Sequence, residues 1–229
     1  MTSPFPNRTL PRGSKLIGTT LMVSDNVVKI DQNNPEPSLI TKAYRVLSRG
    51  GLVVGPTETR YGLLAKVDLP KAVERLFEIK GRSIEKPSAI FVEDISKLKE
   101  LADVTPSAQL LAGKFLPGPL TLVLRSKRDF GQFFTLNNRT GFRISSSPFI
   151  KFLVERTGAL SATSANLSGH KEPNLISEIQ EQLGDKIDLY IDAGKLDNPV
   201  STVVQVVNDG VTMLREGAIS SKDIFAVVK

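Results

Sequence analysis

The spacing of apolar residues alternates along the chain between a helical period and short apolar runs, and Gly or Pro separates the segments. Apolar residues recur on one helical face in four segments, at residues 39–47, 70–80, 105–115 and 148–153. Short apolar runs predict strands at residues 27–30, 52–54, 89–92, 120–124, 141–144 and 160–162. Two more apolar runs flank Asn208-Asp209-Gly210 and predict an antiparallel hairpin near the C-terminus.

Several residues at the ends of these segments are typical of helix boundaries and loops. Gly50 and Gly81 can adopt the left-handed conformation that ends a helix. Asp68 and Thr105 are expected to cap the helices that follow them. Residues 55–62 are expected to form a loop directly after a strand, where α/β sheets commonly place ligands.

Helices alternate with strands, and strands that are apolar throughout need cover on both faces of their sheet. The pattern therefore predicts an α/β protein, with a twisted, mixed parallel and antiparallel sheet and helices on both sides. The chain has 229 residues, of which 40% are apolar, and one domain is expected over residues 26–229. Residues 1–25 are rich in Ser, Thr and Pro, as a transit peptide is, but without an amphipathic stripe they are expected to form a flexible N-terminal tail.

Charge and the scarcity of some residue types narrow the classes of function. Lys and Arg total 30 against 24 Asp and Glu, which favours anionic partners such as nucleotides or RNA, or merely keeps the protein soluble. The chain has no Cys, and its one His, His170, lies in a polar run expected to be an exposed loop, so zinc fingers and a Cys nucleophile are excluded. Any metal must arrive with a substrate, as Mg²⁺ does with ATP. No apolar run approaches the about 18 residues of a membrane span, so a soluble, cytoplasmic protein is expected.

Three polar clusters and one arginine carry side chains suited to anions, and each has a structural alternative. Hydroxyls in residues 55–62 can donate to carboxylate or phosphate oxygens, or simply form a turn. Lys80 and Arg82 can converge on a triphosphate or bicarbonate, or complement a helix dipole. Residues 164–169 can offer backbone N–H groups to phosphate, or start a helix. Arg143, in an apolar strand, needs an anionic partner if it is buried, either a substrate carboxylate or a neighbouring Asp or Glu.

These clusters are more informative together than singly, because their order along the chain is distinctive. None of them is a Walker loop or a Rossmann fingerprint. In order, the segments are Pro56-Thr57-Glu58-Thr59-Arg60-Tyr61-Gly62-Leu63, Lys80-Gly81-Arg82, Lys86-Pro87, Pro117-Gly118-Pro119-Leu120-Thr121, Arg143, Ser164-Ala165-Asn166-Leu167-Ser168-Gly169, Ser201-Thr202-Val203 and Leu214-Arg215-Glu216-Gly217. This set closely resembles the threonylcarbamoyl-AMP synthase (YrdC-like) family, over residues 30–217.

The resemblance implies an enzyme, an L-threonylcarbamoyladenylate synthase and thus a nucleotidyltransferase. Its substrates would be L-threonine, bicarbonate and ATP, with Mg²⁺ entering with the nucleotide, and its products threonylcarbamoyl-AMP and pyrophosphate. A partner threonylcarbamoyl transferase complex would then modify a tRNA adenosine beside the anticodon, and direct contact with tRNA stays open. The resemblance also implies a YrdC-like fold with a basic central cavity, here in the short, single-domain form.

The family motifs also imply roles for individual residues. Threonine would be held by Thr57, Arg143 and Ser201, with Arg143 on its carboxylate. Bicarbonate and the ATP phosphates would be held by Lys80, Arg82, Ser164, Asn166 and Arg215, and the catalytic residues would be Lys80 and Arg82. No metal ligand is implied. No general base stands out: Glu58 is a candidate, with a structural role in its loop as the alternative.

The chain departs from the family pattern at three places. Arg60 replaces a small apolar residue, Ser83 replaces a Pro, and residues 145–147 are serines where a more apolar, His-containing stretch is usual.

A non-catalytic RNA-binding protein with a basic cavity is the alternative function, but aromatic residues are only 6% of the chain and no RNA-binding fingerprint occurs. Carbamoyl-adenylate-forming relatives carry Cys-rich zinc modules, which a chain without Cys does not have.

Overall fold

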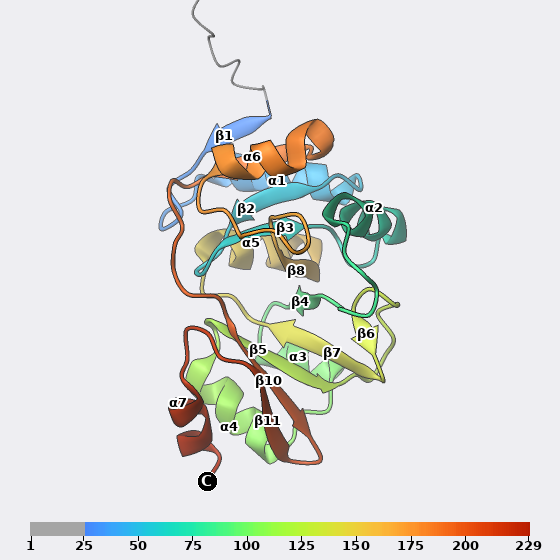
Figure 1. Ribbon diagram of the computed structural model, residues 1–229, viewed down its shortest axis with the longest axis vertical. Coiled ribbons are helices and arrows are strands. Elements are labelled where there is room, and N and C mark those ends of the chain that lie inside the picture. The colour runs from blue at the N-terminus through green and yellow to red at the C-terminus, as the bar shows by residue number, and fades with distance from the viewer. Residues whose placement is uncertain (1–25) are drawn as a thin grey trace, which may run out of the picture.

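Figure 1 shows the computed structural model of the protein, which describes residues 26–229. The strands of these residues are β1 (Val27–Lys29), β2 (Val53–Pro56), β3 (Tyr61–Leu64), β4 (Ala89–Phe91), β5 (Leu120–Arg125), β6 (Thr135–Leu136), β7 (Arg139–Arg143), β8 (Leu160–Ser164), β9 (Leu189–Asp192), β10 (Thr202–Val207) and β11 (Gly210–Arg215). Their α-helices are α1 (Pro37–Ser48), α2 (Pro70–Lys80), α3 (Ile95–Leu101), α4 (Pro106–Phe115), α5 (Pro148–Thr157), α6 (Ile176–Leu183) and α7 (Ser221–Val227). The strands form one sheet in the order β1-β9-β2-β3-β8-β4-β7-β5-β10-β11, with β6 paired to β7.

Strand β8 joins the two halves of this sheet. It pairs antiparallel with β3 on one side and antiparallel with β4 on the other. In one half, β9 runs parallel to both β1 and β2. The other half combines the parallel pairs β4–β7 and β5–β10 with the antiparallel pairs β5–β7 and β10–β11. The prediction of a mixed sheet is therefore confirmed.

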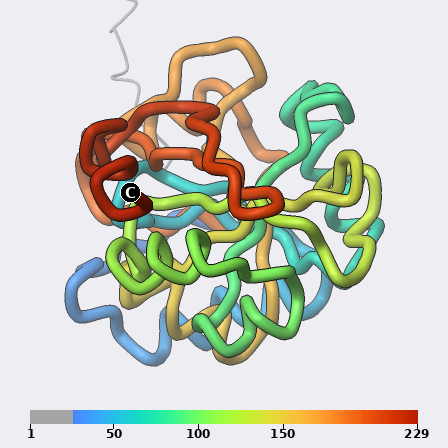
Figure 2. The backbone as a smooth tube through the Cα atoms, turned by 90° about the horizontal axis from the view of Figure 1, so that it is seen from below, coloured from blue at the N-terminus to red at the C-terminus, as the bar shows by residue number. Residues whose placement is uncertain are grey.

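Helices cover both faces of the sheet, which confirms the second part of the predicted architecture. Apolar residues of α1 and α5 form one buried cluster that includes Val53 of β2. Val54 belongs to a second buried cluster with residues of α2, α4, α6 and α7. Because successive residues of a strand point to opposite faces, the two clusters lie on opposite sides of the sheet. Helices α4 and α7 lie side by side in both Figure 1 and Figure 2.

Most of the predicted helix boundaries are confirmed, and one is wrong. Gly50 and Gly81 have φ of 82° and 59°, the left-handed conformation that lets the chain leave α1 and α2. Thr105 caps α4, because its side chain accepts a hydrogen bond from a backbone N–H of the first turn. Asp68 does not cap α2, which begins without a side-chain cap. Its carboxylate instead lies 3.4 Å from the ammonium of Lys66.

Residues 55–62 are not one loop, in contrast to the prediction. The turn between β2 and β3 takes up only residues 57–60, and Tyr61 already begins β3. All four residues of β3 are buried. The polar motif therefore includes the start of a buried strand, β3, which forms a β-hairpin with β2. The sequence pattern also leaves α3, β6, α6, β9 and α7 unassigned, although α6 buries Ile176, Ile179 and Leu183 at helical spacing.

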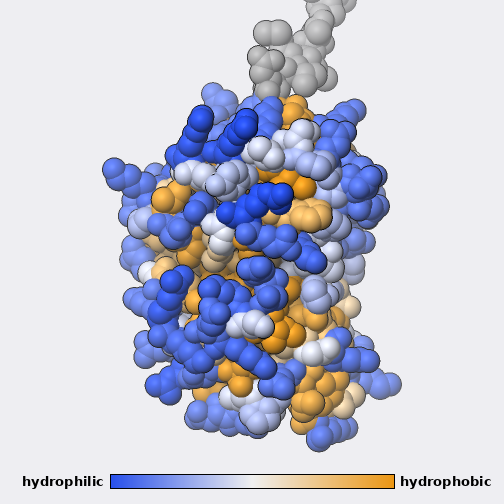
Figure 3. Space-filling view, turned by 180° about the vertical axis from the view of Figure 1, so that it is seen from behind, coloured by the Kyte–Doolittle hydropathy of each residue, from blue (hydrophilic) through white to orange (hydrophobic). Residues whose placement is uncertain are grey.

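The surface agrees with the expectation for the one histidine. His170 is exposed, as its polar surroundings predict. Figure 3 shows hydrophilic residues over much of the face opposite to that of Figure 1, with apolar residues between them. Within residues 26–229, no helix combines the length and the apolar character needed to cross a membrane. The expected N-terminal tail, residues 1–25, lies outside the described residues.

Candidate active site

A cavity of about 580 Å³ is lined by side chains from both halves of the sheet. The β2–β3 turn and β8 contribute to its lining, as do β5, β7, β10 and β11. Its charged lining residues are five arginines and one carboxylate, namely Arg60, Arg82, Arg139, Arg143, Arg215 and Glu172. Because positive charge is in excess, the lining suits an anionic ligand.

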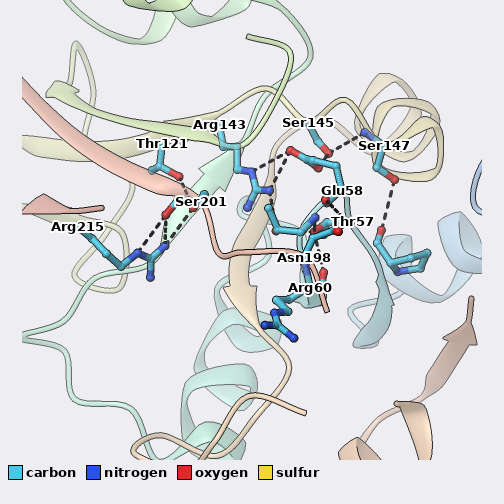
Figure 4. A network of polar contacts seen from close by, with 12 residues as sticks. Thr57, Glu58, Arg60, Thr121, Arg143, Ser145, Ser147, Asn198, Ser201 and Arg215 are labelled. Carbon is cyan, nitrogen blue, oxygen red and sulfur yellow. Dashed lines mark hydrogen bonds and ion pairs between the residues drawn. The ribbon is translucent and has the colours of Figure 1, made fainter. Parts of the chain in front are cut away.

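Arg143, at the end of β7, is buried and forms an ion pair with Glu58 of the β2–β3 turn, as Figure 4 shows. Its Nη2 lies 2.9 Å from Glu58 Oε1 and donates to Thr59 Oγ1 at 2.9 Å. Its guanidinium carbon lies 5.4 Å from the centre of the Phe91 ring, a cation–π contact. The sequence leaves open which group compensates the charge of Arg143. In the structure the carboxylate of Glu58 does so, and Arg143 also lines the cavity. We call Arg143 with Glu58 the paired region.

The β2–β3 turn is closed by hydrogen bonds of its own hydroxyls. Thr57 Oγ1 donates to the carbonyl oxygen of Arg60 at 2.7 Å and accepts the N–H of Thr59 at 3.1 Å. Arg60, which departs from the family pattern, extends from this turn and donates to Leu196 O at 3.2 Å and to Asn174 Oδ1. Its Nε is buried and forms no hydrogen bond with residues 26–229. Thr57 and Arg60 both line the cavity.

Arg82 and Arg215 form a second charged part of the cavity, which we call the unpaired region. Neither forms an ion pair with an acidic side chain in the described chain. Arg82 Nη1 donates to Thr163 Oγ1 at 3.2 Å, and its other two nitrogens donate to backbone carbonyls. Arg215 Nη2 donates to the carbonyl oxygen of Ser201 at 2.8 Å and to its Oγ at 3.0 Å. Ser201 Oγ also lies 3.2 Å from Thr121 Oγ1 (Figure 4).

Burial and a neighbouring cation lower the pKa of each guanidinium of the unpaired region. Burial lowers the pKa of Arg82, and the neighbouring charge of Arg215 lowers it further. Burial also lowers the pKa of Arg215, while Glu172 raises it and Arg143 lowers it by smaller amounts. Cations that are partly desolvated and close together are stabilised by a bound anion. The unpaired region is therefore the part of the cavity best suited to a polyanion.

Lys80, the last residue of α2, is buried and does not line the cavity. Its Nζ donates to Asn166 O at 2.8 Å, to Asn166 Oδ1 at 3.1 Å and to Ser164 O. Burial lowers the pKa of Lys80 to about 7, with a further decrease from Arg82 and an opposing effect of Glu172. Lys80 therefore holds the end of β8 and the residues that follow it, and Ser164, the last residue of β8, lines the cavity.

Six of the eight site residues expected from the sequence line the cavity: Thr57, Arg82, Arg143, Ser164, Ser201 and Arg215. The other two, Lys80 and Asn166, contact each other outside the lining. Thr163, Arg139 and Glu172 line the cavity without having been expected. In the sequence, only their closeness to the recognised motifs or strands could have indicated these three residues. No group of three or more His, Cys, Asp or Glu side chains in residues 26–229 could hold a metal ion.

Known proteins share both the sequence motifs and the architecture. The threonylcarbamoyl-AMP synthase of Bacillus subtilis is 33% identical over 87% of this chain and 58% of that protein. The crystal structure of P. abyssi Sua5 with L-threonine superposes with a TM-score of 0.81 at 31% identity, over 88% of this chain and 60% of that one. The structure of E. coli YciO superposes with a TM-score of 0.79 at 27% identity, over 86% of this chain and 98% of that one.

The chain thus spans 58% and 60% of the first two of these proteins and nearly the full length of the third. The family that matches is Sua5/YciO/YrdC, described as "Telomere recombination", and its match covers residues 45–217. That range contains all eight expected site residues. The matched range covers most of the chain, and the chain therefore belongs to the Sua5/YciO/YrdC family.

Proposed function

We propose that the protein is an L-threonylcarbamoyladenylate synthase, which converts L-threonine, bicarbonate and ATP to threonylcarbamoyl-AMP and pyrophosphate. The observation that carries this proposal is the arginine-lined cavity, with a carboxylate-paired arginine beside unpaired arginines. A cavity of this kind suits a zwitterion and a polyanion at once. The Bacillus subtilis relative is named for this activity, and the P. abyssi relative binds L-threonine in its crystal structure.

Threonine is placed in the paired region. The α-carboxylate meets the guanidinium of Arg143, because hydrogen bonds from a charged guanidinium to a carboxylate are strong. Ser201 Oγ lines the cavity and can form a hydrogen bond with the rest of the amino acid, while Thr57, whose hydroxyl closes the β2–β3 turn, forms the cavity wall beside it. These contacts fix the amine in the cavity so that it can attack bicarbonate.

Bicarbonate and the ATP phosphates are placed in the unpaired region, on Arg82, Arg215 and Ser164. Lys80 and Asn166 act on this region by holding the segment that carries Ser164. The threonine ammonium first gives one proton to solvent, and its nitrogen then forms a bond to the carbon of bicarbonate. A second proton passes from nitrogen to the bicarbonate hydroxyl, which leaves as water and gives a carbamate. A carbamate oxygen then attacks the α-phosphorus, and pyrophosphate leaves with the Mg²⁺ that entered with ATP. Positioning and neutralised charge supply most of the acceleration in such a site.

The product is an activated carbamoyl adenylate, so a second protein must consume it. We place this step before a threonylcarbamoyl transferase complex that modifies tRNA adenosine beside the anticodon, in the cytoplasm. The alternative of a non-catalytic RNA-binding protein would require RNA binding with steep salt dependence and no turnover of ATP. The relatives support the enzyme.

The deciding experiment is ATP–pyrophosphate exchange, together with detection of AMP products, in the presence and absence of each co-substrate. We expect ATP cleavage to AMP and pyrophosphate only when both L-threonine and bicarbonate are present. Serine and glycine serve as matched controls, because they share the α-amino acid group but not the full side chain. Equal turnover with serine, glycine or no amino acid contradicts the proposal.

A further inference from the structure

The guanidinium of Arg143 is only half used within the protein. Glu58 Oε1 accepts from Nε at 3.3 Å and lies 2.9 Å from Nη2. Nη2 also donates to Thr59 Oγ1. Nη1 forms no hydrogen bond with any described residue, although Arg143 lines the cavity. Glu58 and Thr59 therefore take up the N–H groups of Nε and Nη2. The two N–H groups of Nη1 remain for a ligand, and we call them the free edge of the planar group.

Glu58 is itself held in place, from the side opposite to Arg143. Ser145 Oγ donates to Glu58 Oε2, and Ser145 Oγ in turn accepts the N–H of Ser147 at 3.1 Å (Figure 4). Both serines are buried, and they belong to the stretch in which this chain departs from the family pattern. The backbone carbonyl of Glu58 accepts from Asn198 Nδ2 at 3.1 Å. The carboxylate therefore cannot turn away from Arg143 without losing the hydrogen bond from Ser145, and the backbone that carries it is fixed by Asn198.

The pair also changes the charge that a ligand meets. The side chains of Arg143 and Glu58 are only 9% and 13% exposed, so water screens their opposite charges little. The paired region is thus close to neutral, while Arg82 and Arg215 form no ion pair with an acidic side chain in the described chain. The nearby charge of Glu172 offsets that of Arg215 only in part. A neutral region with one free guanidinium edge accepts the carboxylate of a zwitterion. A cationic region would accept any anion, including a phosphate of ATP.

We propose that Glu58, held by Ser145, is a positioning and specificity residue: it directs the free edge of Arg143 into the cavity and cancels its charge, so that this region takes a zwitterionic amino acid. The inference rests on the proposed function, in which Arg143 receives the α-carboxylate of threonine. It assigns the specificity to a residue that need not touch the substrate. It also gives the serine stretch of residues 145–147 a role.

The test compares L-threonine with N-acetyl-L-threonine, which keeps the carboxylate and side chain but has no ammonium, by calorimetry on the folded protein. In Glu58→Gln the amide oxygen can still accept from Arg143, while the negative charge is lost. We expect the preference for L-threonine over N-acetyl-L-threonine to fall on the order of tenfold, because a nearby charge that repels net anions is gone. The bulk of the acetyl group is the same for both proteins and cancels in the ratio. Glu155→Gln, an exposed residue of α5, is the matched control and should leave the ratio unchanged.

Ser145→Ala separates position from charge. This variant keeps the carboxylate of Glu58 but removes one hydrogen bond that fixes it, so we expect about a tenfold loss of affinity for L-threonine with the preference ratio retained. An unchanged ratio in folded Glu58→Gln overturns the charge role, and unchanged threonine affinity in Ser145→Ala overturns the positioning role. If Glu58→Gln does not fold, Ser145→Ala decides the positioning role and the charge role is given up. If the wild-type protein binds neither L-threonine nor N-acetyl-L-threonine, the proposed function is overturned. Results on the variants alone cannot overturn it, so the two failures are distinguishable.

Discussion

The two charged regions of the cavity use the same side chain in opposite ways. Arg143 lies against Glu58 and a ring face, and its charge is compensated inside the protein. Arg82 and Arg215 donate only to carbonyl and hydroxyl oxygens, and burial lowers the pKa of both. A neighbouring arginine lowers each further, Arg215 in the case of Arg82 and Arg143 in the case of Arg215. An arginine with an internal partner binds by shape and hydrogen bonds, whereas one without it depends on the charge of its ligand. The pairing of each arginine therefore indicates which substrate it meets.

The largest effect is expected in the unpaired region. Arg82→Ala should lower the rate of threonylcarbamoyl-AMP formation by on the order of a hundred- to a thousandfold, because one preorganised donor to developing charge is lost. Steady-state kinetics measures this, and thermal unfolding verifies that the variant is folded. Arg156→Ala, an exposed residue of α5, is the control. A folded Arg82→Ala protein with near-normal activity would remove Arg82 from the site.

The paired region should respond in binding rather than in charge. Arg143→Ala should weaken threonine binding on the order of a hundredfold, through loss of a charge-assisted contact to the carboxylate. The affinity for an ATP analogue should change much less. Calorimetry with each ligand separates the two. Unchanged threonine affinity together with a large loss of stability would show that Arg143 is only the structural partner of Glu58.

Lys80, which lies outside the cavity lining, tests whether the protein destabilises a cation that supports the unpaired region. Below about pH 7 the amine is protonated in both the folded and the unfolded chain, so its full burial cost is present. Between that pH and its ordinary value, the unfolded chain binds more protons, so stability rises with pH by up to ~1.4 kcal/mol per pH unit. We expect this rise in the wild-type protein and its absence in Lys80→Met, by denaturant unfolding at several pH values. Parallel pH profiles would show that Lys80 stays charged.

The smallest effect is expected at Arg60. Arg60→Val restores the small apolar residue typical of the family and removes two hydrogen bonds, together with a buried Nε that has none. Because these contributions oppose each other, the free energy of unfolding should change by about 1 kcal/mol or less. Threonine and ATP affinities should be nearly unchanged. A tenfold loss of either affinity would place Arg60 among the substrate-binding residues and blur the distinction between the two regions.

The sequence predicts the local elements better than the cavity. The helical period of apolar residues identifies α2 with both of its ends. Five residues of α2 are buried, four of them apolar and the fifth Lys80, and Gly81 ends the helix. The apolar pattern misses β3, because the polar residues 57–60 precede a strand that is buried on both faces. The site is beyond periodicity altogether. Arg82, Arg143 and Arg215 lie far apart in the sequence, and only strand pairing brings them together.

The family resemblance names six residues that line the cavity, but it does not give their contacts. Nothing in the sequence shows that Lys80 turns inward to the carbonyls of residues 164 and 166, since a lysine at a helix end is usually solvated. The partner of Arg143 is equally hidden. Glu58 is next to Thr57 in the motif, yet its contact to Arg143 depends on the registers of the β2–β3 hairpin and of the parallel β4–β7 pair.

Strand β8 has a consequence for how the protein is made. Because β8 bridges β3 and β4, the hairpin of β2 and β3 and the group of β4, β5 and β7 remain unconnected by backbone pairing until residue 160 has been synthesised. Arg215 leaves the ribosome later still, so a nascent chain has no complete anion site for most of its synthesis. Ligands that bind the cavity can then stabilise only the finished molecule. A ligand of the cavity would thus stabilise complete chains and leave truncated ones exposed to proteolysis.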